Sequence, residues 1–288
     1  MTTREEAMLA KIYVEITNVC NLQCAFCPGT KRAPRQMSPE EFSRLAPEIK
    51  KVTSYVYFHV MGEPLSHPRL ADFLQLAHAN GLRVILTTNG TLLPACQALL
   101  LSQPALHKVN ISLHAMEANG CFSPEGYLRG CCEFAKAACR KEIICNLRLW
   151  NLDGMQQGMN QANARILQLL HEHFPGEWEE NTKGFCMAPK VFLEWGERFE
   201  WPDDAAPDYG ESGFCRALRD QAGILSDGTV IPCCLDHEGT LALGNAFETP
   251  LHEILNSPPA RAIYDGFSRR VRHAALCRHC GYAQRFSK

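Results

Sequence analysis

The sequence predicts an α/β fold: a partial (β/α)6 TIM-like barrel of parallel strands, followed by a small cysteine-rich C-terminal domain. Two observations support this prediction. Apolar, β-branched segments alternate with amphipathic segments through the first two thirds of the 288 residues, a pattern typical of βαβ units and a parallel sheet. Clustered cysteines then follow in the last third. A chain of this length suits one large domain with an appendage.

Five strands are expected in the alternating region, each rich in branched or aromatic residues. The first is KIYVEIT, and the third ends at the turn signal Asn89-Gly90. The carboxyl ends of barrel strands carry the loops that bind ligands, so functional residues are expected there. The expected strand bounds are 11–17, 54–60, 82–88, 107–113 and 142–150.

One helix is expected after each strand. The first has the clearest start, because Ser38 can cap it, Pro39 suits its first turn and Glu41 completes a capping box. The second is expected to stop at Gly81. The expected helix bounds are 38–52, 68–80, 92–102, 125–140 and 160–174.

The composition changes near Pro175 and Gly176, where polar, turn-rich and acidic segments begin. We therefore expect a barrel core over 1–175, a connecting segment over 176–213 that could complete the barrel, and an auxiliary domain over 214–288. Within the last region, GILSDGTVIP predicts a hairpin around Asp227-Gly228.

Charge and hydropathy exclude some classes of protein. The chain has 29 basic and 31 acidic residues, which argues against a nucleic-acid partner because binding to phosphates normally requires a basic excess. No apolar run approaches the ~20 residues that a membrane helix needs. The first residues lack the apolar centre of a signal peptide, so we expect a cytoplasmic protein without a membrane partner.

The chain contains fifteen cysteines. A disulfide framework is typical of short secreted chains, whereas this chain is long and its cysteine count is odd. Metal ligation is therefore the better interpretation of the clustered cysteines. The remaining cysteines, expected to be small buried hydrophobic residues, are Cys96, Cys121, Cys131, Cys132, Cys139, Cys145 and Cys186.

Three cysteines, Cys20, Cys24 and Cys27, lie within eight residues after the first expected strand. Closely spaced thiolates select zinc or iron–sulfur clusters. A structural zinc ion needs a fourth protein ligand, and no partner appears before His59. Three thiolates on a cluster of four irons leave one iron open, so we expect a small molecule that takes part in the reaction to complete the site.

The segment C-N-L-Q-C-A-F-C resembles the motif of the radical S-adenosylmethionine (SAM) superfamily. Three further segments resemble the same family and each lies at a strand end: MGEP (61–64), TTNG (87–90) and NISLH (110–114). The resemblance covers about residues 1–175. It implies that Cys20, Cys24 and Cys27 are catalytic and hold a [4Fe–4S] cluster that binds SAM.

The same resemblance implies that SAM is cleaved reductively to methionine and a 5′-deoxyadenosyl radical, which abstracts hydrogen from a substrate. It also implies a reducing partner such as flavodoxin or ferredoxin. The residues expected to contact SAM are Phe26, Gly62, Glu63, Pro64, Asn89, Ser112 and Arg148. Phe26 corresponds to the aromatic residue beside the adenine, and residues 62–64 to the segment that meets the methionyl amino group. Arg148 could bind the methionyl carboxylate or form an ion pair at the barrel mouth.

The C-terminal cysteines resemble the auxiliary-cluster domain called SPASM, or twitch in its shortened form. We expect one auxiliary [4Fe–4S] cluster held by Cys215, Cys233, Cys277 and Cys280, since few residues follow the last pair. Adjacent residues on an extended strand face opposite ways, so Cys233 or Cys234, but not both, should reach the metal. A four-cysteine zinc site is the alternative.

The sequence therefore favours a radical SAM oxidoreductase that performs a net oxidation or forms a cross-link. Its expected substrate is a peptide or protein, or a small alcohol. Two other interpretations stay open: a two-cluster electron-transfer protein without SAM chemistry, and an RNA-modifying radical SAM enzyme.

Overall fold

The computed structural model describes residues 9–115, 124–152 and 161–286, and the strands of this part form one eleven-stranded sheet. The sheet order is β11-β10-β9-β1-β2-β3-β4-β5-β8-β7-β6. The strands are β1 (Lys11–Val14), β2 (Tyr55–Phe58), β3 (Arg83–Thr88), β4 (Leu106–Ser112), β5 (Ile144–Leu152), β6 (Glu179–Asn181), β7 (Gly184–Ala188), β8 (Val191–Glu197), β9 (Gln221–Ile224), β10 (Thr229–Ile231) and β11 (Gly244–Asn245).

The five expected helices are all present, although Asn160, at the expected start of the fifth, lies outside the described residues. None of the described helices is long and apolar enough to cross a membrane. The α-helices are α1 (Pro39–Val52), α2 (Leu70–Ala79), α3 (Leu93–Leu101), α4 (Pro124–Cys139), α5 (Gln161–His173), α6 (Leu251–Leu255), α7 (Pro258–Ser268) and α8 (Ala275–Arg278). Short 3-10 helices are η1 (Pro64–Ser66), η2 (Leu113–Ala115) and η3 (Gly281–Phe286).

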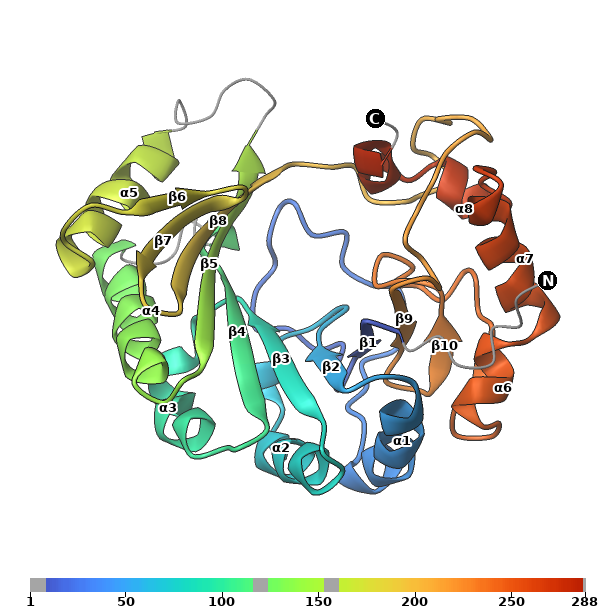
Figure 1. The fold of residues 1–288 in the computed structure, drawn as a ribbon, viewed down its shortest axis with the longest axis horizontal. Coiled ribbons are helices and arrows are strands. Elements are labelled where there is room, and N and C mark those ends of the chain that lie inside the picture. Colours follow the sequence, from blue (N-terminus) through green and yellow to red (C-terminus); the bar gives the residue numbers. More distant parts are fainter. Residues whose placement is uncertain (1–8, 116–123, 153–160, 287–288) are drawn as a thin grey trace.

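Strands β1 to β5 and β8 pair in parallel and curve into a partial barrel, with α1 to α5 on its outer side (Figure 1). The predicted fold class is confirmed, and β8 supplies the sixth strand. Strand β1 is shorter than expected, because the chain leaves the sheet after Val14 and Thr17 instead forms an antiparallel bridge with Gln36.

The C-terminal region joins the same sheet, which the sequence did not indicate. The expected hairpin is present as β9 and β10, which pair antiparallel. Strand β9 also pairs in parallel with β1, from Lys11 opposite Gln221 to Val14 opposite Ile224. The barrel is thereby extended past β1 by a strand about 200 residues away in the chain.

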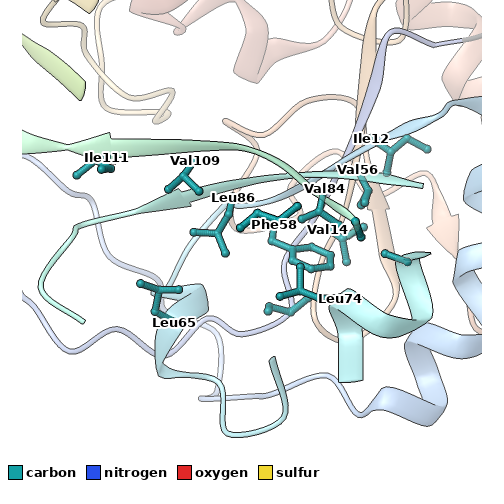
Figure 2. Packing of buried hydrophobic residues seen from close by; sticks show 14 of the residues in the cluster. Ile12, Val14, Val56, Phe58, Leu65, Leu74, Val84, Leu86, Val109 and Ile111 are labelled. Carbon is teal, nitrogen blue, oxygen red and sulfur yellow. The ribbon is translucent and has the colours of Figure 1, made fainter. Parts of the chain in front are cut away.

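The main core lies between the strands and the outer helices. Figure 2 shows Val14, Phe58 and Leu86 on this side of the sheet with Leu74 of α2. Because side chains alternate along a strand, the residues between them, such as Tyr13 and Tyr57, face the barrel interior. The outer face thus stabilises the fold, and the inner face is available for a site.

Local signals position α1 as expected. The backbone N–H of Glu41 donates to Ser38 Oγ at 3.1 Å, and the N–H of Ser38 donates to Glu41 Oε2 at 2.7 Å.

Among the cysteines expected to be buried, the prediction is confirmed for Cys131, Cys132 and Cys145. Three are only half-buried, namely Cys96, Cys139 and Cys186, and Cys121 lies outside the described residues.

Candidate functional site

One cavity of about 1400 Å³ occupies the barrel interior. It reaches from the loops after the strands down to the first residues of β1 and β4. Nearly all of the predicted SAM-site residues line it, namely Cys20, Cys24, Phe26, Cys27, Gly62, Glu63, Asn89, Ser112 and Arg148. Pro64 is buried at the start of η1 and is not among the lining residues.

The loop that carries the three cysteines leaves β1 and returns to α1. Asn18 holds its two ends together: its Oδ1 accepts from the N–H of Arg35 at 2.7 Å, and its Nδ2 donates to the carbonyl of Ala33 at 2.9 Å. Within the loop, the N–H of Cys27 donates to the carbonyl of Cys24 at 3.0 Å, which forms a tight turn. The ends are therefore fixed while the thiols face the cavity.

The Cys20 thiol has polar neighbours. Its Sγ accepts a hydrogen bond from the N–H of Leu22 at 3.4 Å, and Asn89 Nδ2 lies 4.0 Å away. Burial raises the pKa of the Cys20 thiol, and the N–H of Leu22 acts in the opposite direction. A positively charged iron bound there would oppose the effect of burial and favour the thiolate.

The loop after β2 packs directly against the cysteine loop. Gly62 has φ +75°, and a Cβ there would lie 2.3 Å from the carbonyl oxygen of Thr17. The Glu63 carboxylate accepts from the N–H of Leu65 at 3.0 Å and from the N–H of Asn89 at 2.7 Å. Burial raises the pKa of Glu63, and these N–H donors oppose the shift. Glu63 thus joins the loops after β2 and β3.

Phe26 lies at the cavity wall, with its ring centroid 4.8 Å from that of His114. The indole Nε1 of Trp201 donates to the Phe26 carbonyl at 3.2 Å, which connects the cysteine loop to the segment after β8. Ser112 ends β4, and its carbonyl accepts from the hydroxyl of Tyr127 at 3.4 Å.

Arg148 of β5 is engaged in an ion pair. Its Nε lies 3.2 Å from Glu194 Oε2, and its guanidinium lies 4.8 Å from the ring centroid of Trp150. This is the ion pair that the sequence left as an alternative to a contact with SAM. A role of Arg148 toward the methionyl carboxylate stays a prediction.

The four predicted auxiliary ligands converge from three separate segments. Burial, followed by the neighbouring Cys215 and Cys280 thiols, raises the pKa of Cys277 to about 12. Burial, followed by Cys234, Cys215 and Cys277, raises the pKa of Cys233. The buried Arg272 lies close enough to oppose the shift of Cys277. A group of thiols with a cation beside it suits an anionic cluster of thiolates and iron.

Cys233 and Cys234 lie in different surroundings. Cys234 lines the barrel cavity and packs with Tyr13 and Tyr57, whereas Cys233 packs against the main core, as do Cys215 and Cys277. Cys233 is therefore the better candidate for the auxiliary ligand, and Cys234 belongs to the cavity wall.

Both sets of cysteines fit iron–sulfur clusters by the chemistry of their donors. Each set offers soft thiol ligands, and none of the thiols is in a disulfide. Across residues 9–115, 124–152 and 161–286, no group of three or more His, Cys, Asp or Glu side chains has the spacing that would hold a single metal ion. The residues that would hold the clusters are Cys20, Cys24 and Cys27 in the first set and Cys215, Cys233, Cys277 and Cys280 in the second.

The sequence reasoning missed two lysines and two tyrosines at the deep end of the cavity. Lys11, Tyr13, Tyr57 and Lys108 line it there. The signal was available for three of them, because each shares a strand face with another lining residue: Lys11 lies two residues before Tyr13, Tyr57 two before His59, and Lys108 four before Ser112.

Two family models match the chain. The model described as the radical SAM superfamily matches residues 14–144, and the model of an iron–sulfur cluster-binding domain, SPASM, matches residues 215–281. The AdoMet-dependent heme synthase of Oleidesulfovibrio alaskensis is 27% identical over 107 residues, which cover 36% of this chain and 28% of that protein. The alignments of this chain with four of its curated relatives, this heme synthase included, span 24% to 44% of the relatives' own lengths.

Solved structures share the fold. BtrN in complex with AdoMet and 2-DOIA has a TM-score of 0.60 at 18% identity, with 95% of this chain and 93% of that chain covered. Streptococcus suis SuiB bound to the precursor peptide SuiA has a TM-score of 0.63 at 14% identity, with 96% of this chain and 71% of that chain covered.

The fold and the cavity thus define an α/β protein with a cysteine-lined barrel mouth. The chain contains a radical SAM domain followed by a SPASM iron–sulfur domain. These domains imply SAM and [4Fe–4S] clusters as cofactors.

Proposed function

We propose that the protein is a radical SAM oxidoreductase that carries out a net oxidation or a cross-link on its substrate. One observation supports this most strongly: the three thiols, the Gly62–Glu63 turn, Asn89 and Ser112 share one cavity at the ends of four neighbouring strands. A protein that only carries electrons has no need for such a cavity. The comparisons support the radical SAM class, and the oxidation is our proposal.

The residues of the chain have distinct proposed roles. Cys20, Cys24 and Cys27 would hold the cluster, which together with SAM supplies reductive SAM cleavage and hydrogen abstraction from a substrate carbon. Glu63 orients the loops after β2 and β3 through its two backbone hydrogen bonds. The ring of Phe26, which lies beside His114 at the cavity wall, would help to keep water from the reacting groups.

The auxiliary cysteines are proposed to hold one further cluster, which would accept the electron left after hydrogen abstraction. The buried Arg272 supports this proposal, because a cation would stabilise four thiolates. A reducing partner such as flavodoxin or ferredoxin would supply electrons to the first cluster.

The substrate is proposed to be a peptide or protein segment, or a small polar alcohol. Among structures with this fold, SuiB is bound to the precursor peptide SuiA, and BtrN is in complex with AdoMet and 2-DOIA. A cavity of about 1400 Å³ is large enough for SAM together with a side chain or a small molecule.

We also propose the domain limits 1–175, 176–213 and 214–288. Strand β8 lies within the second range and pairs with β5, which supports a connecting segment that completes the barrel. Strand β9 of the third range pairs with β1, so the third domain would fold against the barrel.

The proposed function is tested by SAM cleavage. Protein reconstituted without oxygen and then reduced should bind SAM and form 5′-deoxyadenosine, and Cys24→Ala should lose this activity. Cys139→Ala is the matched control, because this half-buried thiol lies at the end of α4, away from the cavity. Failure of the wild type to bind SAM would instead support the electron-transfer alternative.

The auxiliary role needs a separate variant. Cys277→Ala should retain part of the SAM cleavage but form no oxidised product, because the electron acceptor is lost. Product formation at the wild-type rate would contradict an electron-accepting auxiliary site.

A further inference from the structure

The deep end of the barrel cavity is charged, although barrel interiors are usually filled by apolar side chains. Residues paired in register share one face of a sheet, and one such row runs across the barrel through Tyr13, Tyr57, Ile85, Lys108 and Ile144. Lys11 lies two residues before Tyr13 and therefore faces the same interior. The side chains of Lys11 and Lys108 thus both line the same cavity.

These lysines lie at the opposite end of the strands from the cysteine loop. Lys11 is the first residue of β1, and Lys108 is the third residue of β4. Ser112, at the proposed SAM site, follows Lys108 by four residues along the strand, or about 13 Å. A molecule bound at the cysteine loop and a group bound by the lysines would therefore occupy different parts of the cavity.

The nearby carboxylates are already engaged. Glu194 lies 3.2 Å from Arg148 and 3.9 Å from Lys183, and it accepts from Asn146 Nδ2 at 3.0 Å. Asp220, next to β9, pairs with Arg216 at 2.5 Å. In the part of the chain that the structure describes, no carboxylate lies within 4.0 Å of the ammonium of Lys11 or Lys108.

Aromatic rings orient one of the two ammonium groups. Lys11 Nζ lies 5.2 Å from the ring centroid of Tyr13 and 5.0 Å from that of Tyr57. Cation–π contacts of this kind hold the charge in place without neutralising it. The ammonium of Lys11 remains available to an anion.

The lysines are in an unfavourable environment without a ligand. Burial, followed by the charge of Arg148, lowers the pKa of Lys108 to about 8. Burial also lowers the pKa of Lys11, and Arg148 acts in the same direction. Cations held near one another and away from water reduce stability unless a counter-charge is bound.

We infer that Lys11 and Lys108 bind a carboxylate or phosphate group of the substrate at the deep end of the barrel. This inference rests on the proposed function, because the substrate must enter the same cavity as SAM. It narrows the substrate class to a peptide segment or small molecule whose innermost group is an anion.

The test is an isothermal titration of the reconstituted full-length protein with inorganic phosphate and, separately, with acetate at constant ionic strength. We expect saturable binding of at least one anion to the wild type. Lys11→Met and Lys108→Met should each weaken it by about tenfold or more, because a charged hydrogen-bond donor is lost. Tighter binding of phosphate than of acetate would indicate that the substrate carries a phosphate group, and binding of acetate alone would indicate that it carries a carboxylate.

Lys190→Met is the matched control, since Lys190 pairs with Glu142 and does not line the cavity. It should bind the anion as the wild type does. Absence of saturable binding of both anions to the wild type, or binding that is unchanged in Lys108→Met and Lys11→Met, would overturn the inference.

A second measurement uses only the wild type, so it tests the inference even if the lysine variants fail to fold. Acetic anhydride should acetylate Lys108 of the wild type more slowly when the bound anion is present, while acetylation of Lys190 stays constant. Equal acetylation of Lys108 with and without the anion would overturn the inference. Titration with SAM separates the two proposals: anion binding without SAM binding would contradict the proposed function and leave the anion site intact.

Discussion

Glu15, which directly follows β1, and Arg32, in the loop that carries the three cysteines, form a two-pronged ion pair. Arg32 Nη1 donates to Glu15 Oε1 at 2.8 Å, and Nη2 donates to Oε2 at 2.6 Å. The hydroxyl of Ser226, which follows β9, donates to the same carboxylate at 3.0 Å. One buried carboxylate therefore ties the cysteine loop to the barrel and to the C-terminal region.

Glu15→Gln is expected to loosen this loop. Removal of one charge from a buried pair leaves the other uncompensated, which typically costs about 3 kcal/mol. The variant should unfold at a lower denaturant concentration and retain less iron at the first cluster. Glu142→Gln, which removes a surface ion pair with Lys190, is the control and should change neither quantity. Wild-type stability and iron content in Glu15→Gln would rule out this role.

Gly62→Ala should abolish SAM binding. The added methyl group would lie 2.3 Å from the Thr17 carbonyl oxygen, and the positive φ adds about 1–2 kcal/mol of backbone strain. Gly210→Ala is a matched control, because Gly210 has φ +81° but a Cβ added there would meet no atom within 4 Å. Only the first variant should lose binding in a titration with SAM, and wild-type SAM binding by Gly62→Ala would contradict the prediction.

The two adjacent cysteines should differ in iron content. Cys233→Ser is expected to lose about four irons per chain, whereas Cys234→Ser should keep them. The reason is that Cys233 packs on the same side as Cys215 and Cys277, and Cys234 lines the barrel cavity. Iron and zinc analysis of protein prepared without oxygen measures this directly. The reverse result would assign Cys234 to the auxiliary site, and one zinc in place of four irons would support the zinc alternative.

Lys108→Met is expected to raise stability at pH 7. Burial and Arg148 lower the pKa of Lys108 from 10.5 to about 8, so the folded state disfavours the charged form that the unfolded chain keeps up to pH 10.5. Between these values the unfolded state binds more protons, and the wild type therefore gains stability as the pH rises. The advantage of Lys108→Met should shrink between pH 7 and pH 10 in denaturant titrations. A constant difference would contradict this account of Lys108.

Much of the barrel could be predicted from the sequence, because its signals are local. The capping box of Ser38 and Glu41 marks the start of α1, and both hydrogen bonds are present. The alternation of strands and helices predicts parallel pairing. The three-cysteine motif and the segments at the strand ends predict which residues line one cavity, since parallel strands end on the same side of a sheet.

The remaining features depend on contacts between distant segments. No local pattern shows that β9 pairs with β1, or that Ser226 reaches Glu15. The alternation of side chains predicts that only one of Cys233 and Cys234 faces the metal. Which of the two does so depends on how β10 packs against the rest of the protein. The partner of Arg148 is Glu194 of β8, and the register of these two strands determines that pairing.

The central claim is that Cys20, Cys24 and Cys27 hold a cluster with one iron open to SAM. The most direct test is electron paramagnetic resonance of the reduced protein, handled without oxygen, before and after SAM is added. We expect SAM to change the spectrum of the reduced cluster in Cys277→Ala, which keeps the first site, and to have no such effect in Cys24→Ala. A cluster spectrum that stays the same when SAM is added to wild type and to Cys277→Ala would contradict the claim.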